Sequence, residues 1–192
     1  MNVVGPMLHE VENLQKVHDK WVKANPDAVK APKEALAAYA DHSVPNLSSI
    51  VVLAEVSHKC ISFIGDTRGD KILEGLELAG LIDKGGTLQV DLLKCPRHGS
   101  SNNVDSDFFE RIVADHYVFS ADGEFGNPEP ETLEMLTAAR DNDDYRIHLT
   151  YPVDEIDVAR KAEAAKHKRK RGPPSRASRR FWPTTPSSTT RS

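Results

Sequence analysis

Two side chains that can bind metal ions each follow an apolar, strand-like segment. Asp66 comes directly after ISFIG, and His98 lies three residues beyond the apolar run VDLLKC. Gly65 and Gly99 flank them and allow the backbone to turn sharply. A carboxylate and a neutral imidazole form a ligand set that Zn²⁺ or Mn²⁺ accepts. Each residue alone also fits a plainer role, an N-capping aspartate or a surface histidine, so the pair carries the metal hypothesis.

Strand-like and helix-like segments alternate along most of the chain. The three- and four-residue spacing of apolar side chains predicts an amphipathic helix over 8–24. Two β-rich runs separated by Ser57-His58 predict a hairpin. The alternation favours an α/β fold with helices packed on a sheet. The remaining expected helices cover 31–40, 71–82, 105–114 and 130–141, and the expected strands cover 48–56, 59–65, 87–95, 116–121 and 145–150.

Composition bounds the class of protein. The chain has 192 residues, of which 39% are hydrophobic, enough for one ordinary core. No apolar run approaches the roughly 20 residues of a membrane helix, and the first residues do not resemble a signal peptide. We therefore expect a cytoplasmic protein without a membrane partner. The two cysteines, Cys60 and Cys95, lie inside strand-like runs and should remain reduced.

Charge divides the chain into two parts. Residues 160–192 carry eleven Lys or Arg and one acidic residue, whereas residues 1–159 carry fourteen basic and twenty-eight acidic side chains. The predicted organisation is a folded domain over 1–159 and a disordered basic tail, rich in Pro, Ser and Arg, over 160–192. Clustered cations can bind nucleic acid by releasing counterions from its phosphates. A solvated extension without such a partner fits the same composition.

Four ordered segments resemble one family. NLSSIVVLAE, ISFIGDTRGDKILEGL, VDLLKCPRHGSSNNVDSDFFERI and HYVFSADGEFGNPEPETL are similar to the second half of metallo-β-lactamase-fold hydrolases, over roughly residues 42 to 140. The nearest branch is similar to the cytoplasmic domain of ComEC-type DNA-uptake proteins. The resemblance implies the C-terminal half of an αββα sandwich. It also implies a hydrolase that attacks phosphodiesters or related esters with metal-activated water.

The resemblance assigns roles to particular residues. Asp66 would bridge two metal ions, His98 would be a further ligand, and Asn46 would stand where other branches have a ligating histidine. Ser100 and Asn127 would orient the ligands. Arg97 occupies the place of the family's first paired histidine; it could hold a phosphate but cannot act as a neutral base.

The family's His-x-His-x-Asp-His motif is absent, since no two of the eight histidines are separated by a single residue. We therefore expect a truncated hydrolase, inactive alone, that needs its N-terminal half or a second copy as partner, with Zn²⁺ or Mn²⁺ as cofactor. Two other interpretations stay open. One is a non-catalytic module that binds nucleic acid or protein through the basic tail, and the other is a degenerate reading frame.

Overall fold

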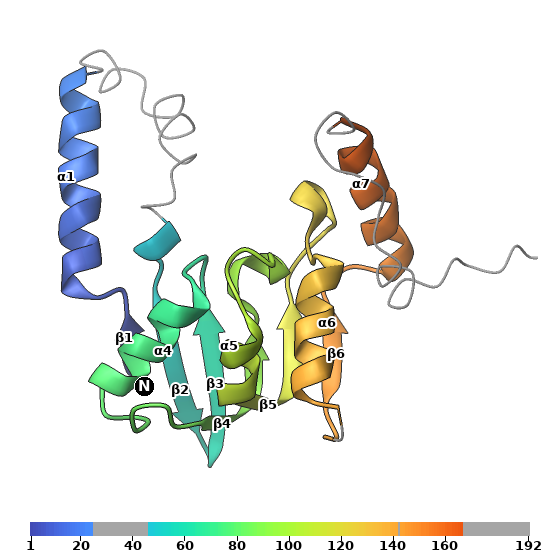
Figure 1. The fold of residues 1–192 in the computed structure, drawn as a ribbon, viewed down its shortest axis with the longest axis horizontal. Helices are drawn as coiled ribbons and strands as arrows, with labels where there is room; N and C mark the ends of the chain where they lie inside the picture. Colours follow the sequence, from blue (N-terminus) through green and yellow to red (C-terminus); the bar gives the residue numbers. More distant parts are fainter. Residues whose placement is uncertain (25–45, 142, 167–192) are drawn as a thin grey trace, which may run out of the picture.

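The computed structural model describes residues 1–24, 46–141 and 143–166. Strands and helices alternate within this part of the chain, as the sequence predicts (Figure 1). Two short 3₁₀ turns, η2 (Pro96–Gly99) and η3 (Glu124–Gly126), follow β4 and β5. The strands and α-helices are β1 (Asn2–Gly5), α1 (Leu8–Ala24), β2 (Val51–Val56), β3 (Lys59–Ile64), α4 (Gly69–Leu78), β4 (Leu88–Lys94), α5 (Ser106–Arg111), β5 (Ile112–Phe119), α6 (Pro130–Ala139), β6 (Arg146–Leu149) and α7 (Val153–Lys166).

The six strands form one mixed sheet whose spatial order follows the chain, β1-β2-β3-β4-β5-β6. The first two pairings are antiparallel, and the other three are parallel. Each parallel pairing needs a crossover, and α4, α5 and α6 supply them on a single face of the sheet (Figure 1). The predicted α/β class is confirmed at this level.

The hairpin predicted between β2 and β3 is confirmed. Ser57 and His58 form its two-residue turn with φ angles of 51° and 64°. Two positive φ angles are the mark of a type I′ turn, whose twist matches that of the flanking strands. The exposed polar side chains of both residues are compatible with this backbone, although neither is glycine.

The face of the sheet that α4, α5 and α6 cover holds the core. Leu93 and Tyr117 pair in register. The side chains of Leu93, Cys95, Tyr117 and Phe119 are fully buried. Phe108 of α5 packs there too. Burial raises the pKa of the Cys95 thiol, which therefore stays neutral and packs as a small apolar group, as predicted.

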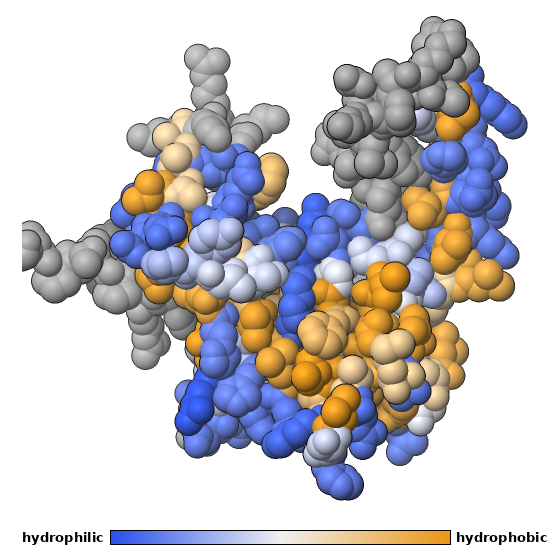
Figure 2. All heavy atoms as spheres, turned by 180° about the vertical axis from the view of Figure 1, so that it is seen from behind, coloured by the Kyte–Doolittle hydropathy of each residue, from blue (hydrophilic) through white to orange (hydrophobic). Residues whose placement is uncertain are grey.

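The opposite face of the sheet, here called the open face, carries no helix of the described ranges (Figure 1). Its side chains alternate with those of the core over most of the sheet, but the alternation shifts by one residue between Val90 and Leu93 of β4 and between Ala114 and Tyr117 of β5. Phe63 is 50% exposed, and Figure 2 shows apolar side chains gathered over this side of the molecule. By register, one row across the open face is Val3, Val52, Phe63, Lys94, Val118 and His148, and the next is Ala54, Ile61, Leu92, His116 and Arg146.

Three predicted helix boundaries are wrong. The helix expected over 105–114 ends at Arg111, because Ile112 already begins β5. The helix expected over 71–82 begins at Gly69 and ends at Leu78. Gly80, with φ of 67°, turns the chain there, and the Leu81 amide returns to the Leu76 carbonyl at 3.0 Å. This is the glycine-ended stop that apolar periodicity alone does not reveal.

Two elements were not predicted. β1 pairs with β2 at the edge of the sheet, and α7 extends through residue 166. The domain boundary predicted at 159/160 therefore falls inside a helix, in which Ile156 is fully buried. The helix expected over 31–40 and residues 167–192 of the predicted disordered tail lie outside the described residues.

Helix α1 has the predicted bounds, but its apolar face is not buried along its whole length. Leu8 is 75% exposed, and Figure 1 shows α1 projecting beyond the edge of the sheet. Its Glu10 is buried and accepts the Met7 amide at 2.9 Å, which stabilises the first turn. Among the helices of the described ranges, none is both long and apolar enough to cross a bilayer.

Candidate functional site

The candidate site lies beyond the carboxyl ends of β3 and β4. Gly65-Asp66 follows β3, and η2 with Arg97 and His98 follows β4. The two loops are joined directly, because the Arg97 amide donates to the Gly65 carbonyl at 3.0 Å. Neighbouring parallel strands end at the same edge of a sheet, so residues 32 positions apart in sequence are brought together there.

The Asp66 and His98 side chains face each other. His98 Nε2 lies 3.7 Å from Asp66 Oδ1, and both side chains are partly exposed. On the other side of the ring, His98 Nδ1 lies 2.6 Å from the Ser120 carbonyl oxygen. A carbonyl only accepts, so Nδ1 carries the proton. With Nδ1 bonded to that carbonyl, Nε2 is the ring nitrogen on the side of the Asp66 carboxylate.

The backbone that holds His98 is in an uncommon conformation. Arg97 and His98 both have left-handed φ angles, 41° and 56°, and Gly99 continues them at 86°. A left-handed residue other than glycine costs roughly 1–2 kcal/mol. The loop is secured by the Gly99 carbonyl, which accepts the Glu129 amide at 2.9 Å and the Thr132 hydroxyl at 2.8 Å. Strain of this kind persists only where the surroundings enforce it, and it is common at functional sites.

Gly99 is required by space as well as by its φ angle. A Cβ at this position would lie 2.7 Å from Phe119 Cδ1 and 2.8 Å from Pro128 Cβ. Gly99 therefore permits a close approach of the backbone that a residue with a side chain would prevent. The approach fixes η2 against β5 and the start of α6, and it places His98 next to Ser120.

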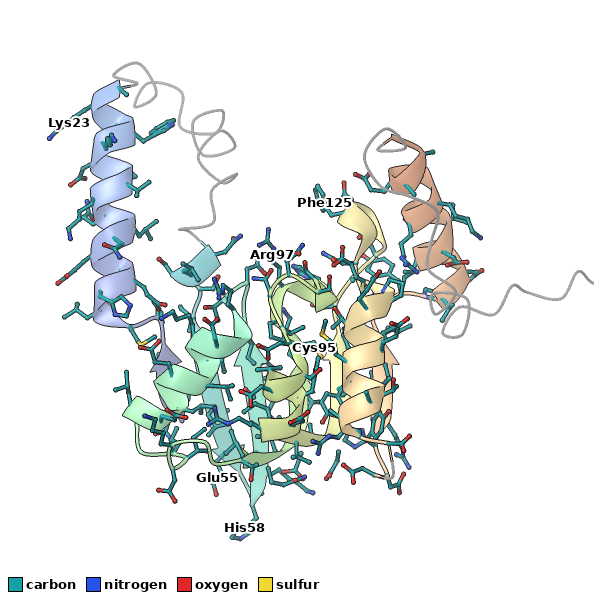
Figure 3. All side chains as sticks on the ribbon, viewed as in Figure 1. Lys23, Glu55, His58, Cys95, Arg97 and Phe125 are labelled. Carbon is teal, nitrogen blue, oxygen red and sulfur yellow. The ribbon has the colours of Figure 1, made fainter. Side chains whose placement is uncertain are left out.

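Arg97 also lies at this edge, above the buried Cys95 (Figure 3). Its Nη1 donates to Asn103 Oδ1 at 3.4 Å. No hydrogen bond or ion pair joins the side chains of the predicted residues Asn46, Ser100 or Asn127 to Asp66 or His98 within the part of the chain that the structure describes. Ser100 is buried directly after η2. Asn46 and Asn127 each lie in a turn: the Asn46 carbonyl accepts the Ser49 amide, and the Asn127 amide donates to the Glu124 carbonyl.

Sequence reasoning missed three residues that interact with the site, two through hydrogen bonds and one through its charge. Asn103 connects the two loops. Its side-chain Nδ2 donates to the backbone carbonyl of Asp66 at 3.4 Å, and its backbone carbonyl accepts the Gly69 amide at 2.7 Å. Ser120 orients His98 by its carbonyl and, at 3.2 Å from Nδ1, its hydroxyl. Asn103 could have been suspected from the polar run SSNN, but the Ser120 contact depends on register.

Lys94 is the third residue that was missed. It belongs to the open face, where it pairs in register with Phe63 and Val118. Burial lowers the pKa of Lys94 below the usual value for lysine, and the Asp66 carboxylate opposes this shift. The site thus has a cation on its open-face side as well as Arg97.

The donor atoms can be tested against a metal ion. Carboxylate oxygen and imidazole nitrogen each bind Zn²⁺ at about 2.1 Å, so two donors 3.7 Å apart can reach one ion between them. Asp66 and His98 therefore fit as two ligands. Within residues 1–24, 46–141 and 143–166, however, no group of three or more His, Cys, Asp or Glu side chains could hold a metal. The described residues would offer two ligands to such an ion.

Comparisons with known proteins leave the family open. No family model matches the chain, and neither a curated protein nor a solved structure matches it.

Proposed function

We propose that this chain is one layer of a metal-dependent hydrolase of the metallo-β-lactamase fold, the C-terminal half of an αββα sandwich, acting on phosphodiesters or related esters. The observation that carries the proposal is the convergence of Asp66 and His98, with the His98 ring held so that Nε2 faces the carboxylate. A second layer, from an N-terminal half or a second copy, would cover the open face and supply the missing ligands.

Each residue of the site has a part in this chemistry. Asp66 and His98 would hold the metal, Zn²⁺ or Mn²⁺, which when bound lowers the pKa of a water molecule and polarises the ester. The Ser120 carbonyl keeps the proton of His98 on Nδ1, so that Nε2 stays available as a ligand. Arg97 and Lys94 would supply positive charge at this edge of the sheet, suited to hold an anionic phosphoryl group.

The open face supports the need for a second layer. Its Phe63 is half exposed, and a contiguous apolar surface on a sheet usually marks an interaction site. Lys94 links that surface to Asp66, because it lies in the open-face row and is subject to the field of the carboxylate. A layer that covered the open face would therefore adjoin the candidate metal site.

Calorimetric titration of the purified chain with ZnCl₂ and MnCl₂ tests the metal part of the proposal. Asp66→Asn and His98→Ala should each lower Zn²⁺ affinity by about tenfold or more, since each removes one ligand. Asp70→Asn is the matched control, because Asp70 is an exposed carboxylate that pairs with Arg68 on α4. Equal affinities for all four proteins would contradict the assignment of Asp66 and His98 as ligands.

Turnover of a phosphodiester such as bis(p-nitrophenyl) phosphate tests the other part. The chain alone should show no metal-dependent hydrolysis, because the described residues offer two ligands. Two tightly held ions per chain together with turnover would show that no second layer is needed.

A further inference from the structure

A pair of histidines lies on the open face, away from the candidate site. His116 of β5 and His148 of β6 approach each other across adjacent parallel strands, with Nδ1 of His116 2.9 Å from Nε2 of His148. Their ring centroids are 5.1 Å apart, and the planes are inclined at 51°. His148 is exposed and His116 is half-buried. One proton can be shared at this contact, so one of the two nitrogens is an acceptor with its lone pair toward the other.

We propose that His116 and His148 form a second metal site, specific for a divalent transition ion such as Ni²⁺ or Cu²⁺, which replaces the shared proton and links β6 to β5. Neutral imidazole is the usual nitrogen ligand for such ions. This site does not depend on the proposed hydrolase function, because it contains neither Asp66 nor His98.

The separation of the nitrogens selects the type of ion. Two nitrogens each about 2.05 Å from an ion and 2.9 Å apart subtend an angle of about 90° at it. That is the angle between neighbouring ligands in the tetragonal geometry of Cu²⁺ and Ni²⁺. A tetrahedral Zn²⁺ site would need about 3.3 Å between the nitrogens. Each ring must turn slightly to direct its lone pair at the ion, and exposure of His148 gives it room to do so.

The surroundings leave the other coordination positions to water. Among the described residues no third His, Cys, Asp or Glu side chain completes a group of metal ligands. Arg146, which pairs with His116 in register, is a nearby cation that opposes metal binding, but its side chain is exposed and solvent screens its charge. The site is therefore one of moderate affinity.

The position of the pair gives the ion a mechanical role. β6 is four residues long and, among the described strands, lies at the edge of the sheet and pairs with β5 alone. An ion bound to a nitrogen on each strand would stabilise that pairing, because a ligand that binds only the paired state shifts the equilibrium toward it. The amides of residues 146–149 should then open less often.

Titration of the full chain with NiCl₂, followed by thermal unfolding and by hydrogen exchange of residues 146–149, tests the proposal. Ni²⁺ should raise the midpoint temperature and slow exchange in β6, and Mg²⁺ should do neither. His148→Gln and His116→Gln should each weaken Ni²⁺ binding by about tenfold or more. Glutamine retains a hydrogen-bonding group, so a folded variant that loses the response points to a lost ligand.

Two further variants separate this site from others. His9→Gln removes an exposed histidine of α1 and should leave the Ni²⁺ response unchanged, and the Asp66→Asn, His98→Ala double variant should keep it. Zn²⁺ should bind the pair more weakly than Ni²⁺ or Cu²⁺. An Ni²⁺ response that persists in His148→Gln, or the absence of any response in the unaltered chain, would overturn the proposal.

Discussion

On the helix-covered face of the sheet Phe119 is fully buried, whereas on the open face Phe63 keeps 50% of its surface exposed. Both are aromatic residues of internal strands, and each pairs in register with an apolar residue, Phe63 with Val52 and Phe119 with Leu149. An internal strand of a parallel sheet is normally covered on both faces. The comparison shows that the sequence provides apolar side chains for two covered faces, while the described residues cover one. The second layer of the proposed hydrolase would pack on the open face.

The largest difference between the faces should appear on truncating the two phenylalanines. Phe119→Ala removes a fully buried ring, and we expect a loss of about 3–5 kcal/mol in the free energy of unfolding. Phe63→Ala should cost less than about 1 kcal/mol in the isolated chain, since much of the ring already contacts water. Urea denaturation measures both. Equal losses would mean that the open face is covered in solution, for example by self-association, which sedimentation would detect.

A smaller effect concerns the polar bonds of the covered face. The buried Tyr117 hydroxyl accepts the Ala114 amide at 3.0 Å and donates to the Ile112 carbonyl at 3.4 Å. Tyr117→Phe leaves that amide without a partner, so unfolding should become easier by about 1–3 kcal/mol. Tyr151→Phe, at a tyrosine that is 47% exposed, should change the urea midpoint little. An unchanged free energy of unfolding in Tyr117→Phe would show that water replaces the hydroxyl.

The smallest effect is a pH dependence in the helix layer. Glu77 of α4 accepts hydrogen bonds from the Gly85 amide and from Arg111. Both lower the pKa of its carboxyl group below the usual value, and the Gly85 amide has the larger effect. A carboxyl group with a lowered pKa stabilises the folded chain above its unfolded pKa of about 4.5, and this stabilisation is lost as pH falls through the folded value. Glu77→Gln should therefore make the free energy of unfolding depend less on pH between about pH 5 and pH 3. Glu12→Gln, on exposed α1, should retain the wild-type profile, and unfolding midpoints across this pH range would reveal the difference.

Local signals explain which parts of the fold were predictable. The apolar runs of β2 to β5 and the periodicity of α1 can each be recognised in a stretch of about ten residues. β1 and α7 lack such patterns, because β1 has four residues and the apolar residues of α7 follow no helical stripe. The start of β5 was assigned to a helix because Ile112 and its neighbours suit either structure, and their pairing with β4 decides the outcome.

The candidate site was predictable in part for the same reason. Asp66 and His98 stand directly after strands, where sequence position alone indicates a common edge. The left-handed turn of Arg97 and His98 was not expected, because contacts between distant segments hold it: Gly99 packs on Phe119, and its carbonyl accepts hydrogen bonds from the start of α6. The His116 and His148 contact was equally hidden, because a cross-strand pair exists only once the register is known.

The identity of sheet order and chain order has a consequence for biosynthesis. From β2 onward, each strand finds its neighbour in the next strand to leave the ribosome, without waiting for a distant segment. Contacts between nearby segments form faster than remote ones. The layer can thus grow strand by strand during translation, with β6 as the last addition to a sheet already assembled.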